Sequence, residues 1–228
     1  MGVTNWLYNY GFEYENPEQP YAVDGFVNSA GAVAGLEAYR KLYETGTPPG
    51  ASNWYMGENI DAYRSGQVAM QMNFAFIWPG VEADENVGGG KSGYFPNPAG
   101  PAGQFAQLGG QGISVVAHSE KQDAALEYIQ WFAQPDVQAR WWELGGYSAL
   151  SAVVEDPDFA SSQPYAQTFL DSMAIVKDFW AEPAYADLLI PMQERMHNYI
   201  VAGAGTAQEA LDGLVRDWTE VFEDEGKL

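Results

Sequence analysis

Two stretches of the chain combine alternating apolar residues, clustered aromatics and glycine-rich backbone, and they restrict the fold more than any other feature. In residues 68–80, Val68, Met70 and Met72 alternate with smaller or polar residues ahead of the sequence FIWPG, a pattern typical of a strand that ends in a turn. Residues 108–117 place the sequence LGGQG before the apolar ISVVA, which favours a second short strand with a glycine-rich approach. Together they predict a cleft where exposed rings and bare backbone meet a small polar ligand.

The charge balance excludes several classes of partner. The formal net charge of -21 disfavours nucleic acid, whose phosphates require Lys and Arg, and anionic membranes. Such acidity keeps a protein soluble and limits self-association, so we expect a monomer. The chain has no cysteine, which excludes disulfides and thiolate metal sites. Its 228 residues suffice for one large domain or two small ones.

Helix signals alternate with glycine- and proline-rich breaks along the chain. Capping residues and apolar positions three or four apart predict helices that begin near Ser29, Asn59, Ser119, Pro135 and Thr206. Residues 82–112 are rich in loop-forming glycine and proline, so we expect the chain to cross between lobes there.

Catalytic and cofactor chemistry has little support in the sequence. The two histidines, His118 and His197, have no ligand-like neighbour one helical turn away, and we interpret both as structural or solvent-exposed. The glycines at 88–93 and 110–112 do not have the spacing or context of nucleotide-binding motifs. The acidic clusters at 82–85 and 155–158 do not follow calcium-loop spacing. We therefore predict no catalytic residue, no metal and no cofactor.

Aromatic residues beside turns point to a saccharide ligand. The apolar face of a sugar ring packs on an aromatic plane, while its hydroxyls need amides and backbone groups as partners. The chain has 8 Trp, 14 Tyr and 11 Phe, and several of them lie next to turns rather than within periodic apolar faces. Most aromatics in a globular chain belong to the core, so each individual residue also has a purely structural interpretation.

Four blocks, in this order, resemble bacterial extracellular solute-binding proteins of ABC importers, most closely the maltose/oligosaccharide branch. They are the helical segment 26–43, the strand-and-aromatic segment 63–78, the Gly-Gly block 109–132, and a last region with Gln138, Gly145-Gly146 and residues 149–153. The resemblance extends over nearly the whole chain. Two departures alter the predicted cleft: Phe74 replaces a usual glycine, and residues 148–150 (SAL) replace a usual proline.

The resemblance implies an α/β fold of the periplasmic-binding-protein type (type II). Residues 1–107 and 146–228 would form a helix-rich C-terminal lobe, and residues 108–145 would be a strand-helix segment of the N-terminal lobe. Because such proteins normally carry a signal peptide and a full N-terminal lobe first, we expect this chain to be a C-terminal fragment. Its segment 108–145 would then expose apolar surface without a partner. The implied location is periplasmic or at the cell surface.

The implied function is to bind a carbohydrate in an aromatic-lined cleft between lobes and to deliver it to a membrane permease, without catalysis. Carried over by position, the residues that line the site would be Asn73, Phe76, Trp78, Gly110 and Gln111, with Trp6, Tyr147, Trp180 and Tyr185 on the same wall.

Three alternatives remain open from the residues. The first is a protein that binds a solute other than a sugar. The second is a carbohydrate-active enzyme that uses cleft carboxylates. The third is a helical interaction module whose aromatics are simply core.

Overall fold

The structure is a computed structural model that describes residues 2–178 and 180–228, and the chain divides into two compact units. Unit 1 comprises Met1–Met72, Asn97–Leu108 and Ile175–Leu228, and unit 2 comprises Asn73–Pro96 and Gly109–Ala174. Unit 2 resumes at Gly109, next to the predicted boundary, but it also takes in segments expected in the C-terminal lobe. The assignment of residues 108–145 to an N-terminal lobe stays a prediction.

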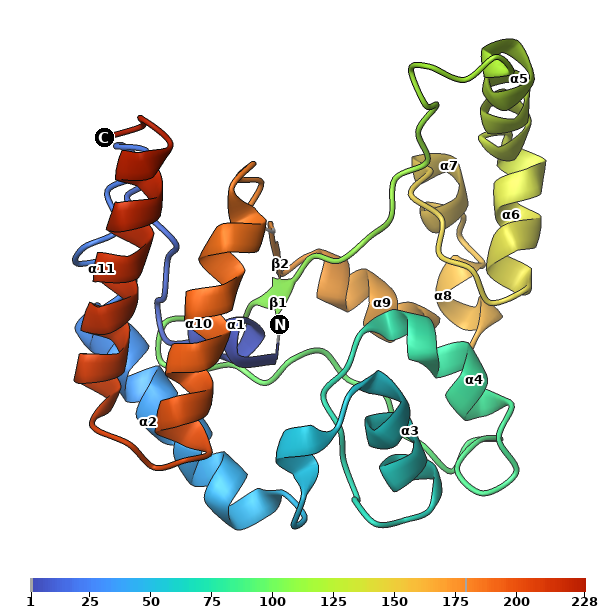
Figure 1. The fold of residues 1–228 in the computed structure, drawn as a ribbon. Helices are drawn as coiled ribbons and strands as arrows, with labels where there is room; N and C mark the ends of the chain where they lie inside the picture. Colours follow the sequence, from blue (N-terminus) through green and yellow to red (C-terminus); the bar gives the residue numbers. More distant parts are fainter. Residues whose placement is uncertain (1, 179) are drawn as a thin grey trace. The chain divides into compact units, whose positions relative to one another are not determined.

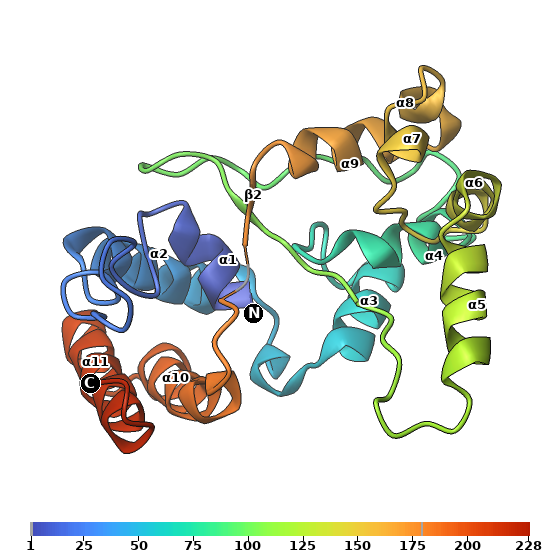
Figure 2. The ribbon, with the colours of Figure 1, turned by 90° about the horizontal axis from the view of Figure 1, so that it is seen from above.

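Unit 1 is built mainly from helices, four of which share one core. The helices are α1 (Gly2–Tyr8), α2 (Ala30–Gly46), η1 (Ala51–Asn53), α3 (Met56–Arg64), α10 (Tyr185–Ile200) and α11 (Ala207–Asp224). Helices α10 and α11 lie side by side, and both contact α2 (Figure 1). Seen from above, α1 lies against α2 (Figure 2). Each of these four helices contributes buried residues, among them Leu7, Leu36, Leu188 and Trp218.

Two of the helix starts predicted in unit 1, at Ser29 and Thr206, are confirmed at atomic detail, whereas the helix expected near Asn59 begins three residues earlier, at Met56. The Ser29 hydroxyl accepts a hydrogen bond from the Ala32 amide, and Thr206 and Glu209 form the predicted capping box of α11. Each bond satisfies a backbone donor that has no partner within the first helical turn. The apolar residues predicted for α11 are buried, from Ala210 to Phe222.

Close packing of α1 on α2 depends on two glycines one turn apart. An added Cβ at Gly31 would lie 2.1 Å from the Tyr10 carbonyl oxygen, and one at Gly35 would lie 2.8 Å from the Tyr10 Cβ. Residues four apart share one face of a helix, so both glycines open the same face to the chain that follows α1. The Trp6 indole N–H then donates to the Gly35 carbonyl at 3.0 Å.

The described strands are two short parallel partners in unit 1. Strand β1 (Ala106–Gln107) pairs with β2 (Val176–Lys177), with Ala106 opposite Val176 and Gln107 opposite Lys177. The other edge of β1 is bound by side chains instead of a strand. Asn9 Oδ1 accepts from the Phe105 amide at 2.7 Å, and Asn5 Oδ1 accepts from the Gln107 amide at 2.7 Å. Two asparagines on or just after α1 thus take the place of a neighbouring strand.

Unit 2 consists of short helices around an aromatic core. They are η2 (Ala75–Ile77), α4 (Trp78–Glu82), α5 (Gln122–Phe132), α6 (Pro135–Glu143), α7 (Ser151–Val154), α8 (Phe159–Ser162) and α9 (Ala166–Met173). Trp142 is central to this core: its ring stacks on Phe159 with a centroid distance of 4.3 Å and contacts Tyr147, Tyr165 and Phe169. The predicted helix from Pro135 is confirmed as α6. The helix expected from Ser119 begins three residues later, at Gln122.

Both predicted strands, in residues 68–74 and 113–117, are wrong: these segments are extended or irregular and pair with no strand. Alternating apolar and polar residues suit a strand, but a strand also needs a neighbouring strand to complete its backbone hydrogen bonds. Apolar side chains of both segments are exposed, including Met70, Ile113 and Val116.

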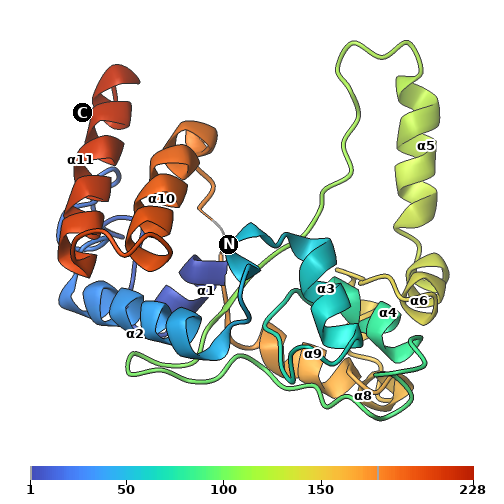
Figure 3. The same cartoon turned by 60° about the horizontal axis from the view of Figure 1, so that its bottom comes forward.

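The sequence pattern predicts an inward side of α5 made of Ala125, Tyr128, Ile129 and Phe132, but Tyr128 is exposed and the other three are only half-buried. The helix has no buried residue, and Leu126, Tyr128 and Trp131 are all at least 48% exposed. A long extended segment leads into it (Figure 3). The predicted exposure of apolar surface in residues 108–145 is therefore observed. Within the described residues, no helix combines the length and the apolar character needed to cross a bilayer.

Candidate functional site

The two stretches predicted to act together do meet, within unit 2, through Phe74 and Gly109. An added Cβ at Gly109 would lie 2.8 Å from Cε1 of the Phe74 ring, a separation too short for any side chain other than hydrogen. Phe74 was noted in the sequence as a departure from the family pattern, and the structure gives it a role. Its ring takes up the space that the bare backbone of Gly109 leaves.

Phe76 is the most exposed aromatic among the predicted site residues of unit 2. Its ring is stacked beside Phe74, with centroids 6.5 Å apart and an interplanar angle of 21°, and the residue is 53% exposed. An exposed ring held by a neighbouring ring is a suitable platform for an apolar ligand face. Beside it, the Asn73 Oδ1 accepts from the Phe74 amide at 2.9 Å, which fixes the orientation of that amide side chain.

Gly110 and Gln111 supply accessible polar groups on the same segment as Gly109. Both residues are exposed and belong to no helix or strand. A Cβ at Gly110 would meet nothing within 4 Å, so the backbone there is open to an approaching group.

Trp78 and Tyr147 pack against the aromatic core of unit 2. Both residues hold the short helix η2 that carries Phe76. The Tyr147 hydroxyl donates to the Ala75 carbonyl at 2.6 Å, and burial raises the pKa of Tyr147 above its ordinary value. Trp78 packs against Tyr94 and Tyr165, with centroid distances of 5.4 and 5.7 Å. These contacts hold Ala75–Ile77 in place, which in turn positions Phe76.

The predicted site residues of unit 1 have structural contacts of their own. Trp6 stacks on Tyr10 at 5.7 Å. Trp180 stacks on Tyr14 at 4.9 Å and donates from its indole to Glu15 at 3.2 Å. Burial, with a smaller effect of Tyr14, raises the pKa of Tyr185 to about 12. A role in ligand binding for Trp6, Trp180 and Tyr185 stays a prediction.

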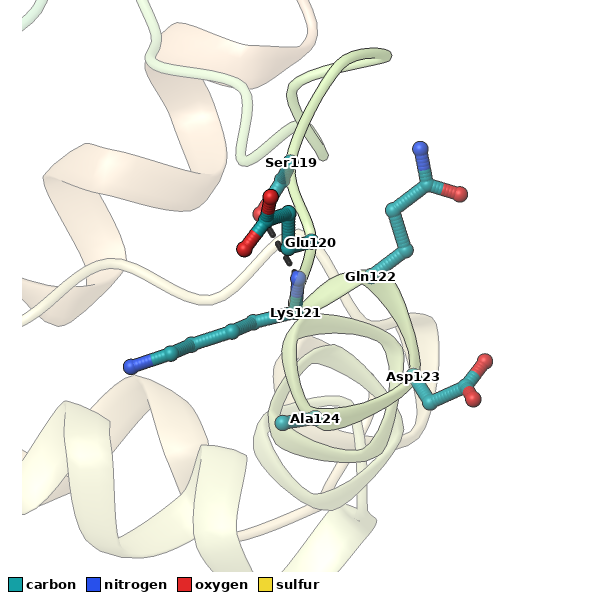
Figure 4. Close-up of a pocket in the computed structure, with 6 residues that line it drawn as sticks. All are labelled: Ser119, Glu120, Lys121, Gln122, Asp123 and Ala124. Carbon is teal, nitrogen blue, oxygen red and sulfur yellow. Dashed lines mark hydrogen bonds between the residues drawn. The ribbon is translucent and has the colours of Figure 1, made fainter.

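Two of the hollows among the described residues differ in how far they are enclosed. One, of about 90 Å³, is in unit 1 and is lined by residues from separate segments, including Trp6, Tyr10, Met72 and Asn97. The other, of about 500 Å³, is lined only by the consecutive residues Ser119–Ala124. Figure 4 shows that the side chains of Lys121 and Asp123 point away from each other there. A surface formed by one segment has no opposing wall, so it offers no enclosed site.

Among the described residues, no group of three or more His, Asp or Glu side chains is placed to hold a metal ion. The groups around Phe76 are aromatic rings, side-chain amides and exposed backbone, a combination suited to a neutral polar molecule.

Solved structures with similar folds include sugar-binding proteins and a solute-binding protein in complex with a polyol. Maltose-bound MalE3 of T. maritima aligns with a TM-score of 0.83 at 22% identity, over 96% of this chain and 56% of that protein. The GacH receptor of Streptomyces glaucescens, solved unliganded and with acarbose, aligns with a TM-score of 0.82 at 21% identity, over 97% and 56%. An ABC transporter solute-binding protein of Agrobacterium radiobacter K84 in complex with ribitol aligns with a TM-score of 0.78 at 21% identity, over 96% and 56%.

These alignments confirm the predicted helix-rich fold of the periplasmic-binding-protein type. The chain spans a little over half the length of each of these proteins. At such identities the similarity concerns the fold.

The family is given by the sequence itself. The sequence model of bacterial extracellular solute-binding proteins matches residues 3–168, which include the segments around Phe76 and Gly110. A match over most of the chain means that this protein belongs to the bacterial extracellular solute-binding protein family.

Proposed function

We propose that this chain binds a carbohydrate, a sugar or an oligosaccharide, as the solute-binding component of an ABC importer. The observation that carries the proposal is the exposed ring of Phe76, which stacks beside Phe74 where that ring packs on Gly109, next to the open backbone of Gly110, in a chain of the solute-binding family. The Phe76 ring would pack on the apolar face of a sugar, and Asn73, Gly110 and Gln111 would bind its hydroxyls.

Trp78 and Tyr147, the other predicted aromatics of unit 2, would have a different role from Phe76. Trp78 and Tyr147 would act by positioning the Ala75–Ile77 turn, because their rings and the Tyr147 hydroxyl are engaged with other protein groups. Binding without catalysis fits the family, whose members are binding proteins, and the amide and aromatic groups around Phe76.

The test is a calorimetric and tryptophan-fluorescence titration of the chain with maltose, maltotriose, acarbose and ribitol. We expect at least one of these to bind, and the Phe76→Ala variant to bind it about tenfold more weakly, the effect of losing about 1.4 kcal/mol of ring stacking. The matched control is Phe95→Ala, which removes a 64% exposed ring elsewhere in unit 2 and should leave affinity unchanged. Binding of amino acids, polyamines or metals in place of every carbohydrate would overturn the proposal.

Delivery to a membrane permease, at a periplasmic or cell-surface location, is the second half of the proposal and rests on the family. Fractionation of the native host, probed with an antibody against the purified chain, checks the location. Crosslinking in the same membranes checks for a permease subunit. Recovery of the protein only from the cytoplasmic fraction would contradict this half.

A further inference from the structure

The chain passes between the two units at four points, and the unit 1 ends of these connections are gathered in one place. Unit 1 stops at Met72, resumes at Asn97, stops again at Leu108 and resumes at Ile175. The strand pair β1–β2 joins the last two ends, because the Ala106 amide donates to the Ile175 carbonyl at 3.0 Å. The third and fourth connections therefore begin side by side within unit 1.

Asn5 on α1 holds the other two connections to β1. Its Oδ1 accepts from the Asn97 Nδ2 at 2.9 Å and from the Gln107 amide at 2.7 Å, and its Nδ2 donates to the Met72 sulfur at 3.4 Å. A thioether is a weak acceptor, but Met72 also lines, together with Trp6 of α1, the hollow of about 90 Å³. One side chain therefore contacts three of the four connections, at or next to the residue where each leaves unit 1.

Two of the segments that Asn5 holds lead directly into the candidate site. A single residue lies between Met72 and Phe74 on one segment, and a single residue lies between Gln107 and Gly109 on the other. In unit 2, the same two segments meet where the Phe74 ring packs on Gly109. Each residue adds at most about 3.6 Å of reach, so segments that begin together at Asn5 have little freedom to separate before they meet again. Holding them in unit 1 removes part of the entropy cost of closing that contact.

Asn9, one helical turn further along, provides the comparison for Asn5. Its Oδ1 accepts from the Phe105 amide at 2.7 Å, and its Nδ2 donates to the Phe105 carbonyl at 3.2 Å and to the Asn5 carbonyl at 3.0 Å. These bonds fix the edge of β1 to α1, and they reach one of the two segments that lead into the site. The bonds of Asn5 reach both segments.

We propose that Asn5 is a positioning residue for the candidate site: it holds together, within unit 1, the two segments that carry Phe76 and Gly110. Asn5 acts through these segments and not by contact with the ligand. Without it the segments would be free to move apart, and a ligand would have to order them on binding, which weakens affinity. The effect on binding rests on the proposed function, whereas the link between the segments is independent of it.

The first test needs no ligand and measures hydrogen exchange of the Ile77 amide by NMR. This amide donates to the Phe74 carbonyl at 3.3 Å and so reports on the turn that carries Phe76. In Asn5→Ala its exchange should become severalfold faster, while amides of α6 in the same unit keep their rates. Each variant is measured at the same interval below its own melting temperature, which separates a local effect from a general loss of stability.

The matched control is Asn9→Ala. It should also lower the melting temperature, because it leaves the Phe105 amide without its partner, but exchange at Ile77 should stay at the parent rate. An unchanged Ile77 rate in Asn5→Ala, or an equal rise in both variants, would overturn the positioning role. If Asn5→Ala does not fold, Asn5→Asp decides, because it keeps an oxygen acceptor for Gln107 and loses the donor to Met72. Ile77 should again exchange faster, and an unchanged rate would overturn the role.

The second test measures affinity with the panel of maltose, maltotriose, acarbose and ribitol. Asn5→Ala should bind the best ligand about threefold to tenfold more weakly, the range expected when binding must order a side chain or loop, and Asn9→Ala should bind it like the parent. If the parent binds a panel member and Asn5→Ala binds it equally well, the positioning role is overturned and the proposed function stands. If the parent binds no panel member, the proposed function is overturned, and the exchange rate of Ile77 still decides whether Asn5 holds the two segments.

Discussion

The two units bury their apolar residues in different ways. In unit 1, α1, α2, α10 and α11 each bury one face in a shared core, and Leu36, Leu188 and Leu214 are fully buried. In unit 2, the core is a cluster of aromatic rings around Trp142, and α5 leaves its apolar side exposed. Both units contain amphipathic helices, so the difference lies in the neighbours that each helix has.

The comparison shows that formation of a helix and burial of its apolar face have different causes. The spacing of apolar residues suffices to define α5, whose first turn has no side-chain capping hydrogen bond, and spacing together with a capping box defines α11. Burial needs a second element to cover the apolar face, and α11 has α10 and α2 for this purpose. Among the described residues of unit 2, α5 contacts mainly the adjoining α6.

The largest expected effect is for Trp218, at the centre of the unit 1 core. The residue is 1% exposed and its indole N–H donates to the Leu188 carbonyl at 2.8 Å, in the part of α10 where Pro191 removes a helical hydrogen bond. Trp218→Ala should reduce the free energy of unfolding by about 3–5 kcal/mol, measured by urea denaturation. Trp218→Phe, which keeps a ring and loses the hydrogen bond, should lose less.

The matched comparison is Trp131→Ala on α5, where the same side chain is 49% exposed. This variant should unfold at nearly the same urea concentration as the parent chain. Equal losses for Trp131→Ala and Trp218→Ala would show that α5 is packed in solution, and the contrast between the units would be wrong.

A smaller loss is expected for Gly35→Ala, because the added Cβ would press on Tyr10 at 2.8 Å. Overpacking of this kind costs about 1–3 kcal/mol, more than alanine gains from its higher helix propensity. The control is Gly57→Ala in α3, where an added Cβ would meet nothing within 4 Å, and which should be neutral or stabilising. Thermal unfolding followed by circular dichroism measures both, and a stabilised Gly35→Ala would mean that α1 does not pack this closely on α2.

Helices and their ends were predictable from sequence because their causes are local. Ser29, Pro135 and Thr206 each mark a helix start that the structure contains. The two predicted strands failed because a strand depends on a partner elsewhere in the chain. Asn5 and Asn9 take the place of a strand on one edge of β1. No sequence pattern indicated this, because asparagines in or beside a helix serve many different roles.

The candidate site was predictable in part. An aromatic cluster before Pro79 and the glycines at 109–112 suggested that the two stretches meet, and Phe74 does pack on Gly109. The sequence did not distinguish the exposed Phe76 from Trp78, which lies in the core cluster, because exposure is set by distant residues such as Tyr165.

The smallest expected effect is on α5 itself. Tyr128 is 53% exposed whereas Tyr165 in the unit 2 core is 2% exposed, so the same substitution can be compared in two environments. Tyr128→Ser should change the free energy of unfolding by no more than about 0.5 kcal/mol, as is usual for exposed positions, and should reduce the fluorescence of an apolar dye bound to the folded chain. Tyr165→Ser should lose several-fold more stability, because it removes a ring that contacts Trp78, Trp142 and Tyr147. If instead the two variants lose equal stability, the α5 face is covered in solution, and the helix has found the partner that its sequence pattern calls for.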